Sequence, residues 1–159
     1  MSRKAVFDAM VFHQAGANPA GPRGACLAHV RAGSITLITR PEIVAEWKGL
    51  LARPNIRKKF PHLTDEVAEG LIREIERIST FIAEVPRVFE YPRDPKDEPY
   101  INLAIAAEAD YLTSRDKDLL DLMQDPDFTA RFPGIRVLDP VALLREIDMA
   151  GQTGQDLPG

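Results

Sequence analysis

The sequence predicts an α/β fold, a three-layer α/β/α sandwich in which helices cover both faces of a parallel, five-stranded sheet. Short apolar runs alternate along the chain with segments of helical periodicity, and this alternation is typical of parallel strands joined by right-handed crossovers. Such sheets are buried on both faces. A chain of 159 residues, 45% of them apolar, can build this core as one domain without metal or disulfide bridges.

Five short apolar runs are the candidate strands, and six segments have helical patterns. The segment 41–51 begins with a proline, which suits the first position of a helix, and its apolar residues form one stripe. The segment 66–78 carries a similar stripe, whereas 99–109 is apolar nearly all round and is expected to be buried. We expect strands at 5–7, 35–39, 81–85, 111–114 and 136–138, and helices at 21–32, 41–51, 66–78, 99–109, 116–123 and 140–147.

The domain is expected to span residues 1–149. Residues 150–159 are rich in glycine and glutamine and lack apolar periodicity, so they are expected to form a disordered tail. No apolar run approaches the roughly 18 to 20 residues of a membrane span, and the first residues do not form a signal peptide. We therefore expect a cytoplasmic protein with no membrane partner.

Composition argues against several kinds of site. The single cysteine, Cys26, excludes an internal disulfide framework and a multi-cysteine zinc site. The three histidines, His13, His29 and His62, have no metal-ligand spacing, which argues against zinc. The net charge of −4 argues against strong nonspecific DNA binding, although it does not exclude a nucleic acid held with the help of metal ions.

Acidic residues follow or flank several predicted strands. Asp8 comes directly after the first strand, and Asp116 lies two residues after the fourth. Asp97 precedes the apolar helix, and Glu46 lies in the second turn of the helix that follows the second strand. Ligands of open parallel sheets bind beyond the carboxyl ends of the strands. We therefore expect these four acids to reach one edge of the sheet.

Carboxylates gathered without basic partners repel one another, and a cation relieves that repulsion. Hard oxygen ligands favour Mg²⁺ or Mn²⁺ over zinc. Mg²⁺ in proteins commonly binds one or two carboxylates together with phosphate oxygens of a substrate. The pattern therefore favours metal-assisted hydrolysis of a phosphodiester.

Each acid also has an ordinary structural explanation. Asp8 could begin a turn, Asp116 could be the N-cap of the helix that follows it, and Glu46 could be a solvated helix residue. Asp97 and Glu98 could be turn and helix-start residues, which are favourable near a helix N-terminus. Asp94 could be a turn residue or a neighbour of the site.

Four segments of the chain resemble the PIN-domain family of small metal-dependent ribonucleases. They are Val-Phe-Asp-Ala-Met-Val at 6–11, Pro-Glu-Ile-Val-Ala-Glu-Trp at 41–47, Arg-Asp-Pro-Lys-Asp-Glu-Pro-Tyr at 93–100 and Tyr-Leu-Thr-Ser-Arg-Asp-Lys-Asp-Leu-Leu at 111–120. The last two together look like the branch of toxin components of toxin–antitoxin pairs (VapC-like ribonucleases). The fold of this family, a five-stranded parallel sheet between helices, agrees with the fold predicted from the periodicity.

The resemblance implies a set of functional residues and partners. The four metal-site acids of the family fall on Asp8, Glu46, Asp97 and Asp116, and a hydroxyl residue near the last acid falls on Ser114. The implied activity is Mg²⁺- or Mn²⁺-dependent RNA cleavage, and the implied partners are an antitoxin protein and a second copy in a homodimer. Met10 departs from the pattern, because the family often has asparagine two residues after its first aspartate, and methionine can only pack.

Two other function classes stay open at this level. One is a non-catalytic module that keeps the fold and binds nucleic acid or protein, which Met10 and the acidic balance favour slightly. The other is a phosphotransfer enzyme with Asp8 as nucleophile, although such phosphatases need a second aspartate where this chain has Met10. Basic residues could guide an RNA backbone or form a solvated surface. They are Arg53, Arg57, Lys58, Lys59, Arg93, Lys96, Arg115 and Lys117.

Overall fold

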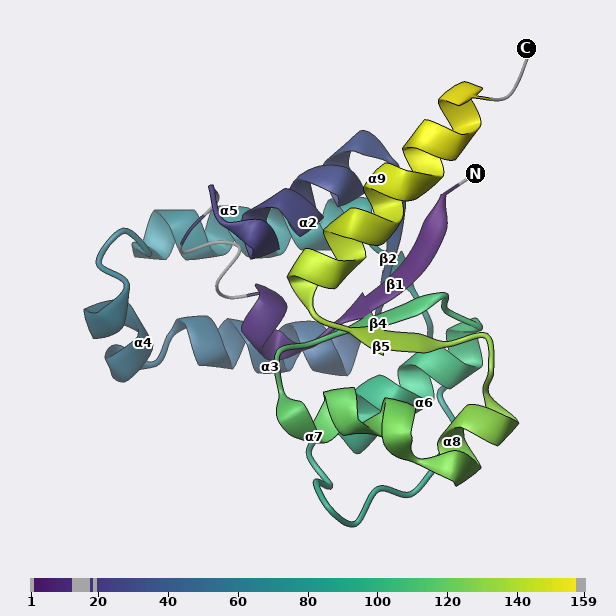
Figure 1. The fold of residues 1–159 in the computed structure, drawn as a ribbon. Coiled ribbons are helices and arrows are strands. Elements are labelled where there is room, and N and C mark those ends of the chain that lie inside the picture. The colour runs from purple at the N-terminus through teal and green to yellow at the C-terminus, as the bar shows by residue number, and fades with distance from the viewer. Residues whose placement is uncertain (1, 13–17, 19, 157–159) are drawn as a thin grey trace.

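The computed structural model describes residues 2–12, 18 and 20–156, with side chains up to residue 149. Its centre is a five-stranded sheet in the order β3-β2-β1-β4-β5, in which every neighbouring pair is parallel. The predicted α/β/α fold is confirmed (Figure 1). The strands are β1 (Arg3–Phe7), β2 (Ile35–Thr39), β3 (Thr80–Phe81), β4 (Tyr111–Thr113) and β5 (Arg136–Leu138).

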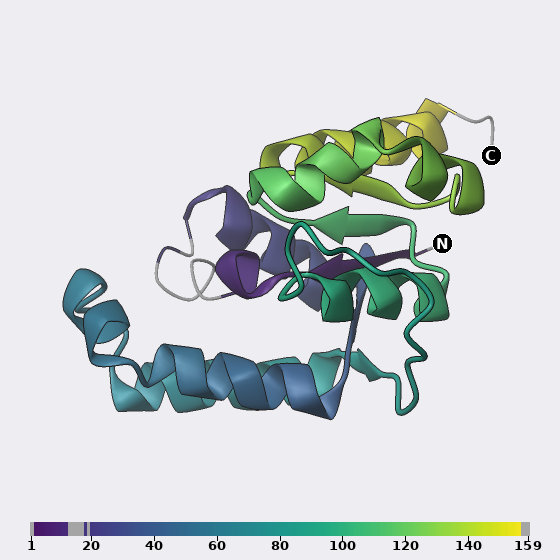
Figure 2. The same ribbon diagram turned by 90° about the horizontal axis from the view of Figure 1, so that it is seen from below.

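Helices cover both faces of this sheet. Helices α2 and α9 pack together on one face, and α6 lies on the other against β1, β2 and β4 (Figures 1 and 2). Helices α3 and α5 run side by side next to the β2–β3 end of the sheet, and α4 joins them (Figure 2). The helices are α2 (Pro22–Ala32), α3 (Pro41–Leu51), α4 (Pro54–Lys59), α5 (Asp65–Ile78), α6 (Glu98–Ala107), α7 (Lys117–Leu120), the 3₁₀ turn η1 (Asp121–Gln124), α8 (Pro126–Arg131) and α9 (Pro140–Asp156).

Strand register places the ends of β1 and β4 side by side. Phe7 of β1 pairs with Thr113 of β4. The next residue, Asp8, donates its N–H to the Thr113 carbonyl at 3.2 Å. Ser114 in turn donates its N–H to the Leu138 carbonyl of β5 at 3.2 Å. The residues that follow β1 and β4 therefore lie next to each other at the carboxyl edge of the sheet.

The core packs the long apolar helix and the α3 stripe against the sheet. Trp47 of α3 is buried and stacks on Phe12, with ring centroids 4.1 Å apart. Ile101 and Leu103 of α6 are fully buried, as the apolar pattern of that segment predicts. None of the helices that the structure describes is long and apolar enough to cross a membrane.

Several element boundaries differ from the prediction. The third strand occupies Thr80–Phe81 rather than 81–85, and the chain from 82 to 97 contains neither helix nor strand. Strand β3 pairs with β2, whose last residue, Thr39, is the partner of Phe81, because α3 begins at Pro41. After the Ile82 N–H, which donates to the Thr39 carbonyl at 3.0 Å, no β2 residue is left to pair with, which explains the early end. The short helices α4 and α8 were not predicted, because six residues are too few to show a periodic stripe.

The C-terminal helix continues beyond the predicted range 140–147. Helix α9 runs from Pro140 to Asp156, so its last turns fall within residues 150–159. The domain boundary at 149 and the disordered tail stay predictions.

Candidate metal centre

A chain of hydrogen bonds joins the ends of β1 and β4. The Ser114 hydroxyl donates to Oδ2 of Asp8 and accepts from the backbone N–H of Asp116 at 2.8 Å. The other Asp8 oxygen, Oδ1, accepts from the N–H of Val11 at 2.9 Å, in the helical turn over residues 9–12. Ser114 is fully buried and Asp8 is only 5% exposed, so this link is fixed inside the protein. It sets the position of Asp8 relative to Asp116.

Asp116 has a capping contact and a place in an acidic cluster at the same time. Its Oδ1 accepts from the N–H of Asp118 at 2.8 Å and so caps α7. One ligand oxygen from each of Asp94, Asp97 and Asp116 lies within 4.8 Å of the others. The structural and the functional interpretations of Asp116 are therefore compatible, because a carboxylate has two oxygens.

Asp97 is the most buried member of this acidic cluster, which consists of Asp94, Asp97 and Asp116. It is the N-cap residue of α6, but its side chain caps no N–H of that helix. The side chain is 8% exposed, and its Oδ2 is buried with no hydrogen-bond partner in the part of the chain that the structure describes. A buried carboxylate oxygen without a donor is costly unless something else compensates it.

The electrostatics of the cluster show that its negative charge is uncompensated. Burial raises the pKa of Asp97 to about 8, and the charges of Asp116, Asp94 and Asp8 add to the effect. Burial also raises the pKa of Asp8; the hydrogen bonds from Ser114 and Val11 lower it in part, and the charge of Asp116 adds to the rise. A divalent cation would supply the missing positive charge and give Asp97 Oδ2 a partner. The oxygen-only donor set suits a hard cation, so the residues present fit Mg²⁺ or Mn²⁺.

Glu46 lies beside the cluster rather than in it. Its exposed carboxylate accepts from the Tyr100 hydroxyl at 3.4 Å, and that hydroxyl accepts from Trp47 Nε1 at 3.1 Å. Burial raises the pKa of Tyr100, and the charges of Glu46 and Asp8 raise it further. Of the four predicted acids, Asp97 and Asp116 lie together in the cluster, Asp8 is linked to Asp116 through Ser114, and Glu46 accepts a hydrogen bond from Tyr100.

The loop over residues 82–97 carries Asp94 and Asp97, and α6 holds it by polar contacts. Glu98 accepts from the Tyr91 N–H at 2.6 Å and from Arg87 Nε at 2.9 Å. The Asn102 side chain accepts from the N–H groups of Val88 and Phe89, both at 2.8 Å, and donates to the Phe89 carbonyl at 3.0 Å. Sequence analysis missed this role of Asn102, although an amide inside an apolar helix is the signal that could have revealed it.

The same loop is also fastened to α7. Arg93 forms ion pairs at 2.7 Å with both Asp118 and Asp121. The Tyr91 hydroxyl donates to the Asp118 carbonyl. Because α7 begins directly after Asp116, these contacts bring Asp94 and Asp97 against Asp116. The structure thus assembles the cluster from two segments held together by side chains outside it.

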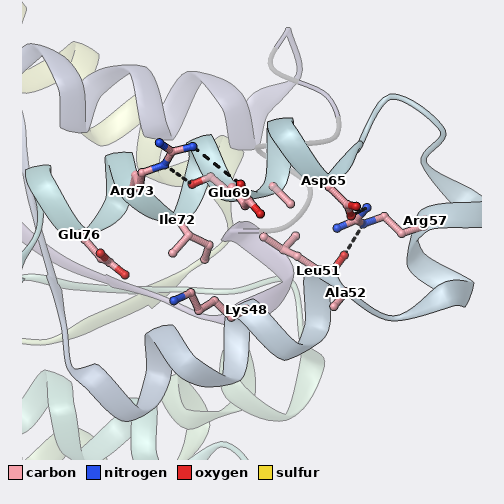
Figure 3. Close-up of a pocket in the computed structure, with 10 residues that line it drawn as sticks. Lys48, Leu51, Ala52, Arg57, Asp65, Glu69, Ile72, Arg73 and Glu76 are labelled. Atoms are coloured by element: carbon pink, nitrogen blue, oxygen red, sulfur yellow. Dashed lines mark hydrogen bonds and ion pairs between the residues drawn. The ribbon is translucent and has the colours of Figure 1, made fainter.

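A separate pocket of about 470 Å³ lies between α3, α4 and α5 (Figure 3). Leu51, Ala68 and Ile72 line its apolar part, and charged side chains surround it. Arg57 donates to the Leu51 carbonyl at 2.6 Å and pairs with Asp65 at 2.7 Å, so one member of the predicted basic segment joins the three helices. None of the acids of the metal centre lines this pocket.

Two further residues of the sequence analysis have different outcomes. Met10 lies in the helical turn over 9–12 and is 46% exposed, so it does not fill the core. His13 lies outside the residues that the structure describes.

A family model described as PIN domain matches residues 4–118. The chain belongs to the PIN-domain family. The match spans all of the strands up to β4 and ends just past Asp116. PIN domains are generally metal-dependent nucleases, in agreement with the acidic cluster. No curated protein and no solved structure matches the chain.

Proposed function

We propose that this PIN domain is a Mg²⁺- or Mn²⁺-dependent endoribonuclease that hydrolyses RNA phosphodiester bonds. The observation that carries the proposal is Asp97, whose buried Oδ2 has no hydrogen-bond partner among the described residues and whose carboxylate clusters with two others. Acids placed only as caps or turn residues would have donors for their buried oxygens. Asp8 has such donors, Ser114 and Val11, which argues against a nucleophilic role for its carboxylate.

Asp97 and Asp116 would hold the cation, with Asp94 contributing from the same loop and Asp8 directly or through water. A bound Mg²⁺ or Mn²⁺ supplies an activated water and stabilises negative charge on the phosphate oxygens. Ser114 keeps Asp8 in position through its hydroxyl, so it is a positioning residue. Glu46, exposed at the rim, orients the attacking water or helps to bind a second metal.

The proposed biological role is that of the toxin in a toxin–antitoxin pair, with a homodimeric protein and an antitoxin partner. It is supported by the resemblance of segments 93–100 and 111–120 to that branch of the family. Expression of the toxin in bacteria should arrest growth, and expression of Asp116→Asn should not. Growth arrest that persists in this variant would contradict the role.

The direct test is cleavage of a mixed pool of single-stranded RNA with Mn²⁺, with Mg²⁺ or with EDTA. Wild type and Asp116→Asn are compared, with Glu69→Gln in the α3–α5 pocket as the matched control. We expect cleavage by wild type and by the control only with a metal, and none by Asp116→Asn.

A second candidate, a non-catalytic RNA-binding module, is favoured by Met10, which removes a carboxamide near Asp8. Its distinguishing result is retained RNA binding without cleavage under any metal. That outcome would replace the nuclease proposal.

A further inference from the structure

Two arginines border the metal centre on the side of Asp8. Arg23 lies in the first turn of α2, and Arg115 lies between Ser114 and Asp116. Arg23 is partly buried, and its Nε is fully buried without a hydrogen-bond partner in the described part of the chain. Arg115 is exposed. Sequence analysis placed Arg115 among the basic residues near the acids but did not identify Arg23.

Neither arginine forms an ion pair within the described ranges. Ten other basic side chains there do, including Arg93 and Lys117 close to the same site, whereas exposed residues such as Lys58 and Arg145 form none. Arg23 differs from those exposed residues because its unpaired Nε is buried. The undescribed residues 13–17 and 19, which precede α2, contain no acidic side chain that could pair with them. Within the described residues, no carboxylate therefore forms an ion pair with either guanidinium group.

Both arginines lie at the carboxyl edge of the sheet. Helix α2 connects the parallel strands β1 and β2, so its first turn, with Arg23, lies at the end of β1 where Asp8 follows. One turn further along α2, the Cys26 thiol donates to the Pro140 carbonyl just past β5 at 3.7 Å, and β5 also receives the N–H of Ser114, the residue before Arg115. In agreement with this placement, burial lowers the pKa of Arg23, the charge of Arg115 lowers it further, and the charge of Asp8 acts in the opposite direction. Two positive groups at one edge are stabilised when an anion binds to both.

The acidic cluster and the two arginines are suited to ligands of opposite charge. Carboxylates select a cation, whereas guanidinium groups bind phosphate oxygens through two parallel hydrogen bonds. The first turn of α2 contains no acid, so nothing there competes for Arg23. A phosphodiester strand that passes the metal centre would meet both groups.

We propose that Arg23 and Arg115 bind a phosphodiester group of the substrate strand next to the acidic cluster, and so place the strand on the metal centre. The proposal rests on the proposed nuclease function, because it takes the ligand to be that enzyme's substrate. It assigns to these residues a role in binding the backbone rather than in reading bases.

The test measures binding separately from cleavage. Each variant, Arg23→Gln and Arg115→Gln, is built in the full chain carrying Asp97→Asn, which is expected not to cleave. Binding of a fluorescent single-stranded RNA is followed by anisotropy over a series of salt concentrations. The matched control is Arg145→Gln on α9, an exposed arginine without an ion pair in the described part of the structure.

We expect each variant to weaken RNA binding about 3- to 10-fold, and each to lower the slope of log affinity against log salt by roughly 0.7, the loss of one phosphate contact on a single strand. The control should change neither quantity. The same losses are expected on single-stranded DNA, because the pair contacts phosphate. An unchanged salt slope in both variants, or a loss confined to RNA, would overturn the proposal.

A second readout separates this site from a purely structural role. In the otherwise wild-type chain, removing a positive charge beside Asp8 should tighten Mn²⁺ binding a few-fold, which damage to the fold would not do. Arg115→Gln is the safer variant because its side chain is exposed. If wild type fails to cleave RNA while these variants still lose binding, the nuclease function is wrong and the phosphate site stands. If wild type cleaves and the variants bind and cleave as the control does, the phosphate site is wrong.

Discussion

The metal centre and the α3–α5 pocket both gather charged side chains, but they balance those charges differently. The pocket is lined by three basic and three acidic residues; Arg57 of α4 pairs with Asp65 of α5, and Arg73 pairs with Glu69 within α5. The acidic cluster holds three carboxylates, and one of their buried oxygens has no donor in the described structure. Charges paired in this way hold helices together, whereas unpaired charges of one sign are suited to a ligand.

Contacts around the acidic cluster hold its carboxylates in place despite their mutual repulsion. Arg93 does not neutralise the cluster, because its two ion pairs go to Asp118 and Asp121 outside it. Glu98 and Asn102 hold the loop by its backbone, whereas Asp94 accepts from the Lys96 N–H of its own turn, at 3.2 Å, and Asp97 Oδ2 has no donor among the described residues. The contacts of Arg93, Glu98 and Asn102 thus hold the mutually repelling carboxylates of the cluster together, as the surrounding residues of a preorganised binding site do.

The largest expected effect comes from removing the buried member of the cluster. Asp97→Asn keeps the size of the side chain but removes the charge, and it should lower RNA cleavage by more than about 100-fold, since even neighbours of metal ligands cost 10- to 100-fold. The matched variant in the pocket, Glu69→Gln, should cleave as wild type does. Initial rates of RNA cleavage at saturating Mn²⁺ measure both.

Asp97→Asn should affect stability in the opposite direction to activity. Without metal, Asp97→Asn should unfold at the same or a higher temperature than wild type, because it relieves repulsion. A marked fall in its melting temperature, together with retained cleavage, would show that Asp97 has a structural role only.

The second prediction concerns the contacts that hold the acid-bearing loop. Asn102→Ala leaves the N–H groups of Val88 and Phe89 and the Phe89 carbonyl without their partner, so it should lower the free energy of unfolding by about 2 kcal/mol or more. It should also weaken Mn²⁺ binding, because the loop positions Asp94 and Asp97. Urea unfolding and Mn²⁺ titration measure these effects, with the exposed Asn55→Ala as the control. Normal Mn²⁺ affinity in a destabilised Asn102→Ala would uncouple the loop from the metal centre.

The fold follows from the sequence more completely than the metal centre does. The stripe of α3 and the apolar run of α6 predict buried helices correctly, because burial imposes a period that a single sequence displays. The end of β3 was misplaced, since the run after Phe81 is apolar enough for a strand but has no β2 residue left to pair with. Pairing capacity, rather than hydrophobicity, decides that boundary.

The site residues that follow strand ends could be predicted from the sequence, whereas the position of Asp94, which a loop determines, could not. Asp8 and Asp116 follow adjacent parallel strands, so topology alone brings them to one edge. Asp94 was interpreted as a turn residue, and its place in the cluster depends on how the loop over residues 82–97 folds back on α6 and α7. That path is set by Glu98, Asn102 and Arg93, whose contacts span the tertiary structure and have no local pattern.

The third prediction is that the stability of the protein depends on pH through Asp97 and not through the acidic residues of the α3–α5 pocket. The pKa of Asp97 is raised to about 8, so between pH 4 and pH 8 the folded protein keeps a proton that the unfolded chain has lost. The free energy of unfolding of the metal-free protein should therefore fall as the pH rises through this range, by at most about 1.4 kcal/mol per pH unit from this group.

Asp97→Asn should reduce that slope, and Glu69→Gln should leave it unchanged. Saturating Mn²⁺ should reverse the trend, because metal binding needs the deprotonated carboxylate. Thermal unfolding from pH 5 to pH 8, with and without Mn²⁺, measures the slopes. Equal slopes in wild type and Asp97→Asn would contradict the assignment of the titration to this carboxyl.

The smallest expected effect is that of restoring a polar side chain beside Asp8. Met10 is 46% exposed, so Met10→Asn should change the free energy of unfolding by no more than about 0.5 kcal/mol. A carboxamide two residues after Asp8 can hydrogen-bond a carboxylate, a water or the substrate, whereas methionine cannot, so cleavage rate or Mn²⁺ affinity should rise a few-fold. Rate and Mn²⁺ titration are compared with those of Met149→Asn on α9. If Met10→Asn matches that control in both, the metal centre works without a carboxamide at this position, and the uncompensated carboxylates alone account for its chemistry.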